Sequence, residues 1–118
     1  RRPEHQQYKR LQDLAAAFDK MQECPGRLNK QDFEVWDGAL APGYGQLGSV
    51  AAQAMSLLGK YEGHIVDPTY TAKSFAAIPA LVMSGRIPKG SRVVFIHTGG
   101  LGAVFAYQED IRSALTDV

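Results

Sequence analysis

The first part of the chain has apolar residues at helical spacing. The members of this apolar face are Tyr8, Leu11, Leu14, Ala15, Phe18 and Met21. Pro25-Gly26 follows them, and this pair favours a stop because proline cannot continue a helix and glycine suits its end. The pattern therefore predicts a first helix that ends before Pro25.

A second apolar face follows downstream. Its members are Val50, Ala54, Leu57, Leu58 and Tyr61. Gly63 comes directly after them and is expected to end this second helix in a left-handed conformation.

A third helix is predicted after Asp67-Pro68. Aspartate can accept hydrogen bonds from the free N–H groups of a helix start, and proline has no N–H to leave unpaired. The helix should run to about Ser84 and end at Gly85, with a bend at Pro79, which cannot donate a hydrogen bond to the Phe75 carbonyl.

Two segments have strand patterns. Asp32–Trp36 alternates polar and apolar residues, and Val93–Ile96 is a continuous apolar run of the kind that parallel sheets bury on both faces. A short apolar pair, Ile65-Val66, precedes the third helix. Helices that alternate with strands predict an α/β fold, a partial open and mostly parallel sheet with flanking helices.

Composition and charge restrict the function. The chain has 118 residues, of which 45% are hydrophobic and 21% charged, which is the composition of one globular domain. A net charge of +1 with scattered charges argues against a nucleic-acid partner. The uncharged stretch Ser74–Ser84 is too short to span a membrane, so no membrane association is expected.

The start of the sequence and the single cysteine indicate the cellular location that is expected for the protein. No secretory signal pattern is present and Cys24 has no second cysteine to pair with, so a cytoplasmic location is expected. Because the sequence opens with Arg1 rather than methionine, it is expected to be a piece of a longer protein.

Three places carry candidate chemistry. Thr98–Gly102 is a glycine-rich turn that follows an apolar run, where it could approach a cofactor closely or serve only as a turn. Tyr70-Thr71 offers two hydroxyls at the start of the third helix, for a ligand or for capping. Tyr44 lies in the glycine-rich segment Leu40–Gly48, and its phenol could face a pocket or pack on the surface.

The remaining candidates have plainer explanations. Lys73 invites a Schiff-base hypothesis, but a solvated or salt-bridged helix lysine is the favoured explanation. His97 fits a hydrogen-bonded residue at the end of an apolar run better than a ligand, because no second histidine, cysteine or paired carboxylate stands at metal spacing. No metal site is expected.

Three runs in order carry a family resemblance. They are Pro42–Gly45, Glu62–Lys73, and Val94–Gly100 with Phe105–Tyr107. Together they resemble the C-terminal third of the D-cysteine desulfhydrase and 1-aminocyclopropane-1-carboxylate deaminase family. These are pyridoxal-phosphate enzymes of the tryptophan synthase β-subunit fold, also called fold type II. Residues before Asp32 match no motif of the family, and Pro79 interrupts a helix that is continuous there.

The resemblance implies that residues 1–118 are the C-terminal portion of a lyase. In such enzymes a Gly-Asn-Lys motif with the Schiff-base lysine, a Ser-Asn-(Gln/His) loop and a Thr-Gly-Ser phosphate loop lie upstream, and none occurs in this sequence. Lys73 matches a supporting lysine of the family instead. The chain alone is therefore expected to be inactive, to need the N-terminal part of the same enzyme, and to belong to a homodimer.

The resemblance also assigns two catalytic residues. Tyr44 matches the family tyrosine that reaches the substrate side of the cofactor, and Tyr70 matches a second active-site tyrosine near the pyridine ring. Both phenols would orient a small amino-acid substrate or relay protons.

Four further positions are expected to bind the cofactor, pyridoxal 5'-phosphate. Thr71 stands where the deaminases carry a glutamate against the pyridine nitrogen, and Thr98 stands where they carry a leucine. A hydroxyl, for which Thr98 is the candidate, leaves the ring nitrogen largely neutral, whereas a carboxylate makes the ring a stronger electron sink. Gly99 and Gly100 would keep side chains away from the edge of the ring.

The two threonines favour the desulfhydrase branch. The predicted reaction removes sulfide from D-cysteine and yields pyruvate, hydrogen sulfide and ammonia. Deamination of 1-aminocyclopropane-1-carboxylate and sulfite release from cysteate stay open, as does a non-catalytic binding module. A phosphate-binding domain built on Gly99–Gly102 is ranked last, because it lacks the lysine of a Walker loop.

Overall fold

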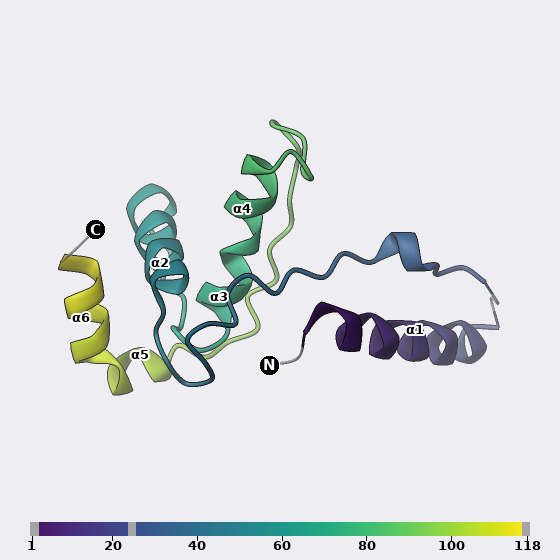
Figure 1. Cartoon of the computed structure of the whole chain (residues 1–118), viewed down its shortest axis with the longest axis horizontal. Coiled ribbons are helices and arrows are strands. Elements are labelled where there is room, and N and C mark those ends of the chain that lie inside the picture. Colours follow the sequence, from purple (N-terminus) through teal and green to yellow (C-terminus); the bar gives the residue numbers. More distant parts are fainter. Residues whose placement is uncertain (1–2, 24–25, 117–118) are drawn as a thin grey trace. The chain divides into compact units, whose positions relative to one another are not determined.

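The computed structural model describes residues 3–23 and 26–116. The chain divides into two compact units, Arg1–Asp37 and Gly38–Val118. Helices are the regular structure of both units (Figure 1). Within the two described ranges, no residue lies in a β-strand.

The first unit contains α1 (Glu4–Met21) and one turn of 3-10 helix, η1 (Lys30–Asp32). The predicted first helix is confirmed, and Ala15 on its apolar face is buried. Its predicted stop at Pro25, like Cys24, lies outside the described residues.

The strand predicted at Asp32–Trp36 is wrong. Asp32 completes η1, and residues 33–37 are irregular. The hydroxyl of Tyr8 donates a hydrogen bond of 3.3 Å to the Phe33 carbonyl, so α1 holds this segment through a side chain. Polar and apolar alternation shows which face of a strand could be buried, but a strand also needs a neighbouring backbone to pair with.

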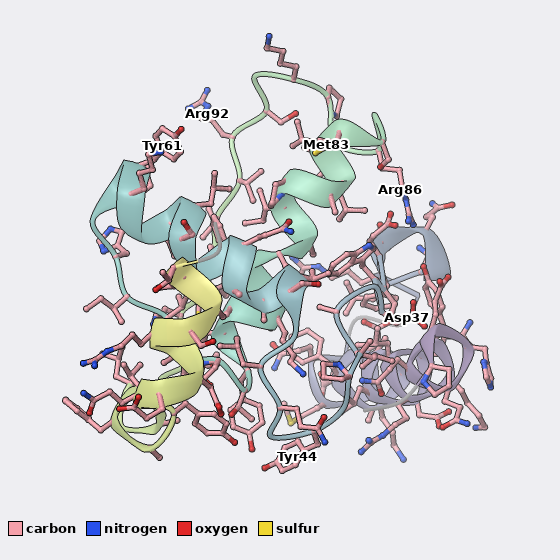
Figure 2. The ribbon with its side chains drawn as sticks, turned by 60° about the vertical axis from the view of Figure 1, so that its left-hand side comes forward. Asp37, Tyr44, Tyr61, Met83, Arg86 and Arg92 are labelled. Carbon is pink, nitrogen blue, oxygen red and sulfur yellow. The ribbon has the colours of Figure 1, made fainter. Side chains whose placement is uncertain are left out.

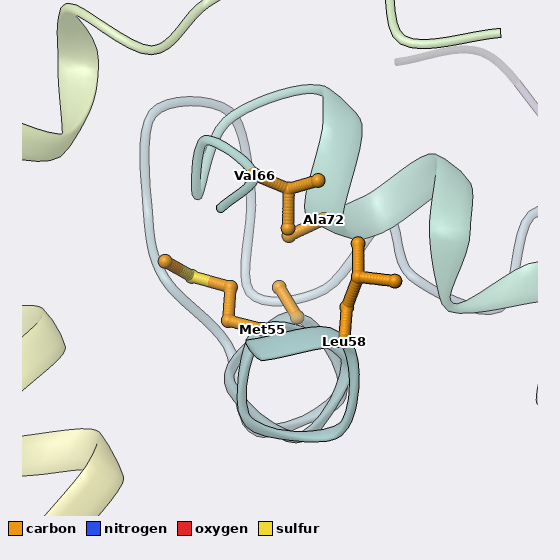
Figure 3. Packing of buried hydrophobic residues seen from close by; sticks show 5 residues of the cluster. Met55, Leu58, Val66 and Ala72 are labelled. Atoms are coloured by element: carbon orange, nitrogen blue, oxygen red, sulfur yellow. The ribbon is translucent and has the colours of Figure 1, made fainter. Parts of the chain in front are cut away.

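The core of the second unit lies between α2 (Ser49–Glu62) and the segment that follows it. Its buried members are Ala51, Met55, Leu58, Val66 and Ala72 (Figure 3). In Figure 3 the side chains of Met55, Leu58, Val66 and Ala72 converge on one another. The predicted second helix is thus confirmed, and Gly63 ends it in the left-handed conformation, with a φ of 67°.

The third predicted helix forms as two pieces, α3 (Thr71–Phe75) and α4 (Ala77–Met83). The interruption falls at Ala76, beside the Phe75 carbonyl that Pro79 cannot bond. Because α4 restarts at Ala77, Pro79 lies in its first turn, where a helix needs no N–H donor. The predicted helix entry and end are confirmed in outline. The helical hydrogen-bond pattern is interrupted at Ala76, although Ala76 keeps helical dihedrals, with φ −56° and ψ −24°.

The predicted α/β fold is wrong. Residues 93–96 form no ladder with any described segment, and Val94 and Ile96 are 87% and 75% exposed rather than covered on both faces. Figure 1 shows this part of the chain as a coil beside α3 and α4. It contacts α3 through side chains, since the rings of Phe75 and Phe95 meet edge to face with centroids 5.6 Å apart. An apolar run becomes a sheet strand only where a partner supplies backbone donors and acceptors.

The chain ends in two short helices, α5 (Ala103–Ala106) and α6 (Gln108–Thr116). Ile111 of α6 packs against the core, so α6 lies beside α2 (Figure 1). This last helix was not predicted. No helix in the described part of the chain combines the length and hydropathy that a bilayer span requires.

Candidate active site

The two predicted catalytic tyrosines lie together. The hydroxyls of Tyr44 and Tyr70 share a hydrogen bond of 2.5 Å, and their rings meet edge to face with centroids 5.9 Å apart. Each residue is about half exposed, at 53% and 54%. A phenol can both donate and accept, so the pair can hold a proton at either oxygen and offer hydrogen bonds to a carboxylate.

Tyr44 projects from an irregular segment that precedes α2 (Figure 2), Pro42–Gly48, which we call the Tyr44 loop. Two side chains bind its backbone on either side of Tyr44. The Lys73 ammonium donates to the Gly43 carbonyl at 2.7 Å, and the Tyr107 hydroxyl donates to the Gly45 carbonyl at 2.7 Å.

Glycine is required at position 45 of this loop. Its φ is 66°, a left-handed conformation that other residues avoid, and a Cβ there would lie 3.2 Å from the Tyr107 hydroxyl. The pattern of glycines around Tyr44 therefore serves the close approach of Tyr107.

Asp67 connects Tyr70 and Thr71. Its carboxylate has no exposed surface and accepts hydrogen bonds from the N–H groups of Thr69, Tyr70 and Thr71 at 2.7–2.9 Å. The Thr71 hydroxyl donates to the same carboxylate at 2.6 Å and accepts from the Asp67 N–H at 2.9 Å. The expected capping role of Asp67 is confirmed, and the hydroxyl of Thr71 is used within the chain.

The same hydrogen bonds control the charge of Asp67. Burial by itself raises the pKa of this carboxyl, but hydrogen bonds from the Thr71 hydroxyl and from three backbone N–H groups together outweigh it. The net result is a pKa below the ordinary value, so Asp67 is an anion at neutral pH.

The glycine-rich turn packs directly on Asp67. A Cβ at Gly100 would lie 2.6 Å from an Asp67 carboxylate oxygen, and the φ of Gly100 is 95°, so only glycine fits. Gly99 has open space where a side chain would be, and Thr98 is exposed beside it.

His97 fastens the start of this turn. The Gly99 N–H donates to Nδ1 of His97 at 3.1 Å, so Nδ1 carries no proton and Nε2 is the donor to the Ile65 carbonyl, 3.2 Å away. This geometry agrees with the plainer of the two explanations of His97, a hydrogen-bonded residue rather than a ligand.

The structure thus brings the predicted residues together in two groups joined by Asp67. Tyr44 pairs with Tyr70, whose N–H is bound by Asp67, and Gly100 packs on the other side of the same carboxylate. The sequence pattern did not assign a contact to Lys73 or Tyr107. From the sequence, Lys73 is only a Schiff-base candidate, a solvated or salt-bridged lysine, or a supporting lysine of the family, and Tyr107 is only part of a quoted family run.

Thr98 and Gly99 leave the outer side of the turn open to a planar ring such as that of pyridoxal phosphate. Thr98 offers an exposed hydroxyl that could serve a ring nitrogen, and Gly99 leaves the space beside it free of side-chain atoms. The ammonium of Lys73 donates to the Gly43 carbonyl.

One hollow in the described part of the chain contains none of these residues. It lies in the first unit, has a volume of about 700 Å³, and is lined by one face of α1 and by Leu28, Asn29 and Phe33. The buried carboxylate of Asp19 opens onto it, with one oxygen bound to the Leu28 N–H at 3.4 Å and the other without a partner.

Comparison with known proteins defines the class to which this arrangement belongs. The profile of a family described as "Pyridoxal-phosphate dependent enzyme" matches residues 4–99, which is most of the chain. The chain therefore belongs to this family of pyridoxal-phosphate enzymes.

Among its relatives are the D-cysteine desulfhydrases of Salmonella newport (strain SL254) and Salmonella heidelberg (strain SL476). Each is 38% identical to this chain over 80 residues, which are 68% of this chain and 24% of the relative. The chain thus spans about a quarter of the length of these relatives.

Proposed function

We propose that this chain is the C-terminal portion of a lyase that converts D-cysteine and water to pyruvate, hydrogen sulfide and ammonia. The observation that carries the proposal is the pair of hydrogen-bonded phenols, Tyr44 and Tyr70, joined through Asp67 to a turn with an open glycine. The 38% identity to D-cysteine desulfhydrases supports the choice of substrate.

Bound pyridoxal phosphate supplies an electron sink that stabilises a carbanion at the substrate α-carbon. In the proposal, Tyr44 and Tyr70 orient the substrate and move a proton between their phenol oxygens and the substrate. Their shared hydrogen bond lets one phenol hold the other in place while it acts. Asp67 fixes the backbone of Tyr70 and so its position in the pair.

The turn residues are proposed to contact the cofactor. Thr98 would offer its hydroxyl to the ring nitrogen, and Gly99 would let the ring approach the backbone. Gly100 would fix the position of the turn, because it packs against the Asp67 carboxylate. Thr71 would act indirectly. Its hydroxyl donates a hydrogen bond to the Asp67 carboxylate, against which the turn packs.

We also propose that the lysine that binds the cofactor lies in an N-terminal part of the enzyme outside these residues. Lys73 is bound by a carbonyl, and the relatives are about four times longer than the matched segment. The chain by itself is then inactive. A homodimer and a cytoplasmic location are proposed from the family resemblance.

A chimera tests the proposal. The 80 matched residues of the Salmonella newport enzyme are replaced by those of this chain, and the product is purified with pyridoxal phosphate. Sulfide and pyruvate are measured with D-cysteine, sulfite with cysteate, and 2-oxobutanoate with 1-aminocyclopropane-1-carboxylate. We expect sulfide from D-cysteine, and a loss of kcat/KM of roughly 10²–10⁴-fold in Tyr44→Phe and Tyr70→Phe.

Tyr61→Phe is the matched control, because Tyr61 is an exposed tyrosine at the far end of α2 (Figure 2). Turnover of cysteate or of the cyclopropane substrate in place of D-cysteine would assign the chain to one of those reactions. A folded chimera that binds the cofactor but turns over none of the three substrates would support the alternative that the chain is a non-catalytic binding module.

A further inference from the structure

The Tyr44 loop has little in its own sequence to hold it in one shape. Tyr44 stands between Gly43 and Gly45, and glycine has the greatest conformational freedom of any residue. Loop residues without regular hydrogen bonds would let the phenol move away from Tyr70. What holds the phenol must therefore come from elsewhere in the fold.

Lys73 supplies the first attachment. It lies in α3, three positions after Tyr70, and its half-buried side chain reaches the Gly43 carbonyl at 2.7 Å. A hydrogen bond from an ammonium is stronger than one between neutral groups. Because Tyr70 directly precedes α3, this bond ties the loop of one tyrosine to the helix that positions the other.

Tyr107 supplies the second attachment from the end of α5. Its half-buried hydroxyl donates to the Gly45 carbonyl at 2.7 Å, and the absence of a side chain at Gly45 allows this approach. The two bonds therefore fall on the residues immediately before and after Tyr44.

We propose that Lys73 and Tyr107 are positioning residues that hold the Tyr44 phenol against Tyr70. The inference rests on the proposed function, in which these two phenols act on the substrate. Neither residue belongs to the buried core of Ala51, Met55, Leu58, Val66 and Ala72. Loss of either bond should therefore release the loop while the helices persist.

The first test uses the full 118-residue chain with ¹³C-labelled tyrosine. Nuclear Overhauser cross-peaks between the rings of Tyr44 and Tyr70 report their contact, and circular dichroism reports the fold. We expect the cross-peaks to be lost in Lys73→Met and Tyr107→Phe, and to return in Lys73→Arg, which restores a charged donor.

The matched controls remove an ammonium or a phenol hydroxyl at other positions of the chain. Lys89→Met removes an ammonium from an exposed loop, and Tyr61→Phe removes the hydroxyl of an exposed tyrosine. Both should leave the cross-peaks unchanged. The proposal is overturned if the cross-peaks persist in both Lys73→Met and Tyr107→Phe, or if both variants unfold, because positioning requires that the fold survive the loss of one bond.

The second test places the same variants in the chimera with cofactor bound. We expect kcat for D-cysteine to fall by roughly 10–100-fold with a smaller change in KM, because a misplaced group costs rate more than affinity. The cofactor absorbance should stay unchanged.

The two tests separate the two hypotheses. If the cross-peaks respond as expected but D-cysteine is not consumed, the proposed function fails and the positioning role stands. If D-cysteine is consumed and neither readout responds to the variants, the positioning role fails and the proposed function stands.

Discussion

At the scale of single residues, the carboxylate of Asp67 holds two parts of the candidate site. It binds the N–H groups at the start of α3, including that of Tyr70, and the glycine-rich turn rests on it at Gly100. Four donors bond the Asp67 carboxylate, and only its ionised form can accept from all of them. A protonated carboxyl would carry an O–H with no acceptor. The geometry of the site therefore depends on one ionised group.

This dependence predicts how stability changes with pH. The folded pKa of Asp67 lies below its unfolded value, because hydrogen bonds from Thr71, Tyr70 and Thr69 outweigh the effect of burial. The stabilisation is present above the unfolded pKa of about 3.9 and is lost as the pH falls through the folded pKa. Asp67→Asn should lower the free energy of unfolding at pH 7 by about 1–3 kcal/mol.

Urea unfolding of the full chain from pH 7 down to pH 2 measures this effect. The difference between wild type and Asp67→Asn should shrink as Asp67 becomes protonated. Asp110→Asn, at an exposed position of α6, is the control and should show no such convergence. A difference that stays constant with pH would contradict the assigned role of the charge.

At the scale of elements, the break between α3 and α4 shows how one proline is accommodated. The helix pattern continues through Ala76 in the sequence, but Pro79 has no N–H for the Phe75 carbonyl. The chain ends one helix at Phe75 and starts the next at Ala77, which places Pro79 in a first turn. Ala72 of α3 packs in the core of the second unit.

Pro79→Ala should join the two helices. The new N–H can donate to the Phe75 carbonyl, so we expect a continuous helix over 71–83, a larger helical circular-dichroism signal, and slow hydrogen exchange at the new amide. Pro88→Ala, in the loop after α4, is the control and should leave the helical signal unchanged. Rapid exchange at the amide of residue 79 would show that the break has another cause.

At the scale of the whole molecule, the hydrogen bonds described above for the candidate site lie in one unit. The tyrosine pair, the Asp67 hydrogen bonds, the two attachments of the Tyr44 loop and the core all fall within Gly38–Val118. The first unit has its own contacts, such as that of Tyr8 with Phe33. We therefore expect the site geometry to form without α1.

A chain of residues 38–118 should therefore keep the site. We expect it to show the Tyr44–Tyr70 cross-peaks and the helical signal of α2 to α6. The full chain is the reference, measured under the same conditions. If the truncated chain loses the cross-peaks while it stays helical, α1 contributes to the site after all.

Local sequence was enough to predict α1, α2 and the start of α3, and to identify the family, but it did not predict α6. The apolar spacing of α1 and α2 and the stop at Gly63 follow from backbone preferences that act over one or two turns. The motifs around Tyr44, Tyr70 and Gly99 predicted the family, and the family profile matches residues 4–99.

Tertiary structure alone decided the rest. The strands predicted at Asp32–Trp36 and Val93–Ile96 did not form, because a ladder depends on a partner backbone that a local pattern cannot reveal. The contacts of Lys73 with Gly43 and of Tyr107 with Gly45 join residues 30 and 62 positions apart. Such bonds exist only once packing has brought their segments together. The sequence by itself therefore determined the local helix preferences of α1, α2 and α3 and which polar side chains are present, while the fold determined which of these groups meet.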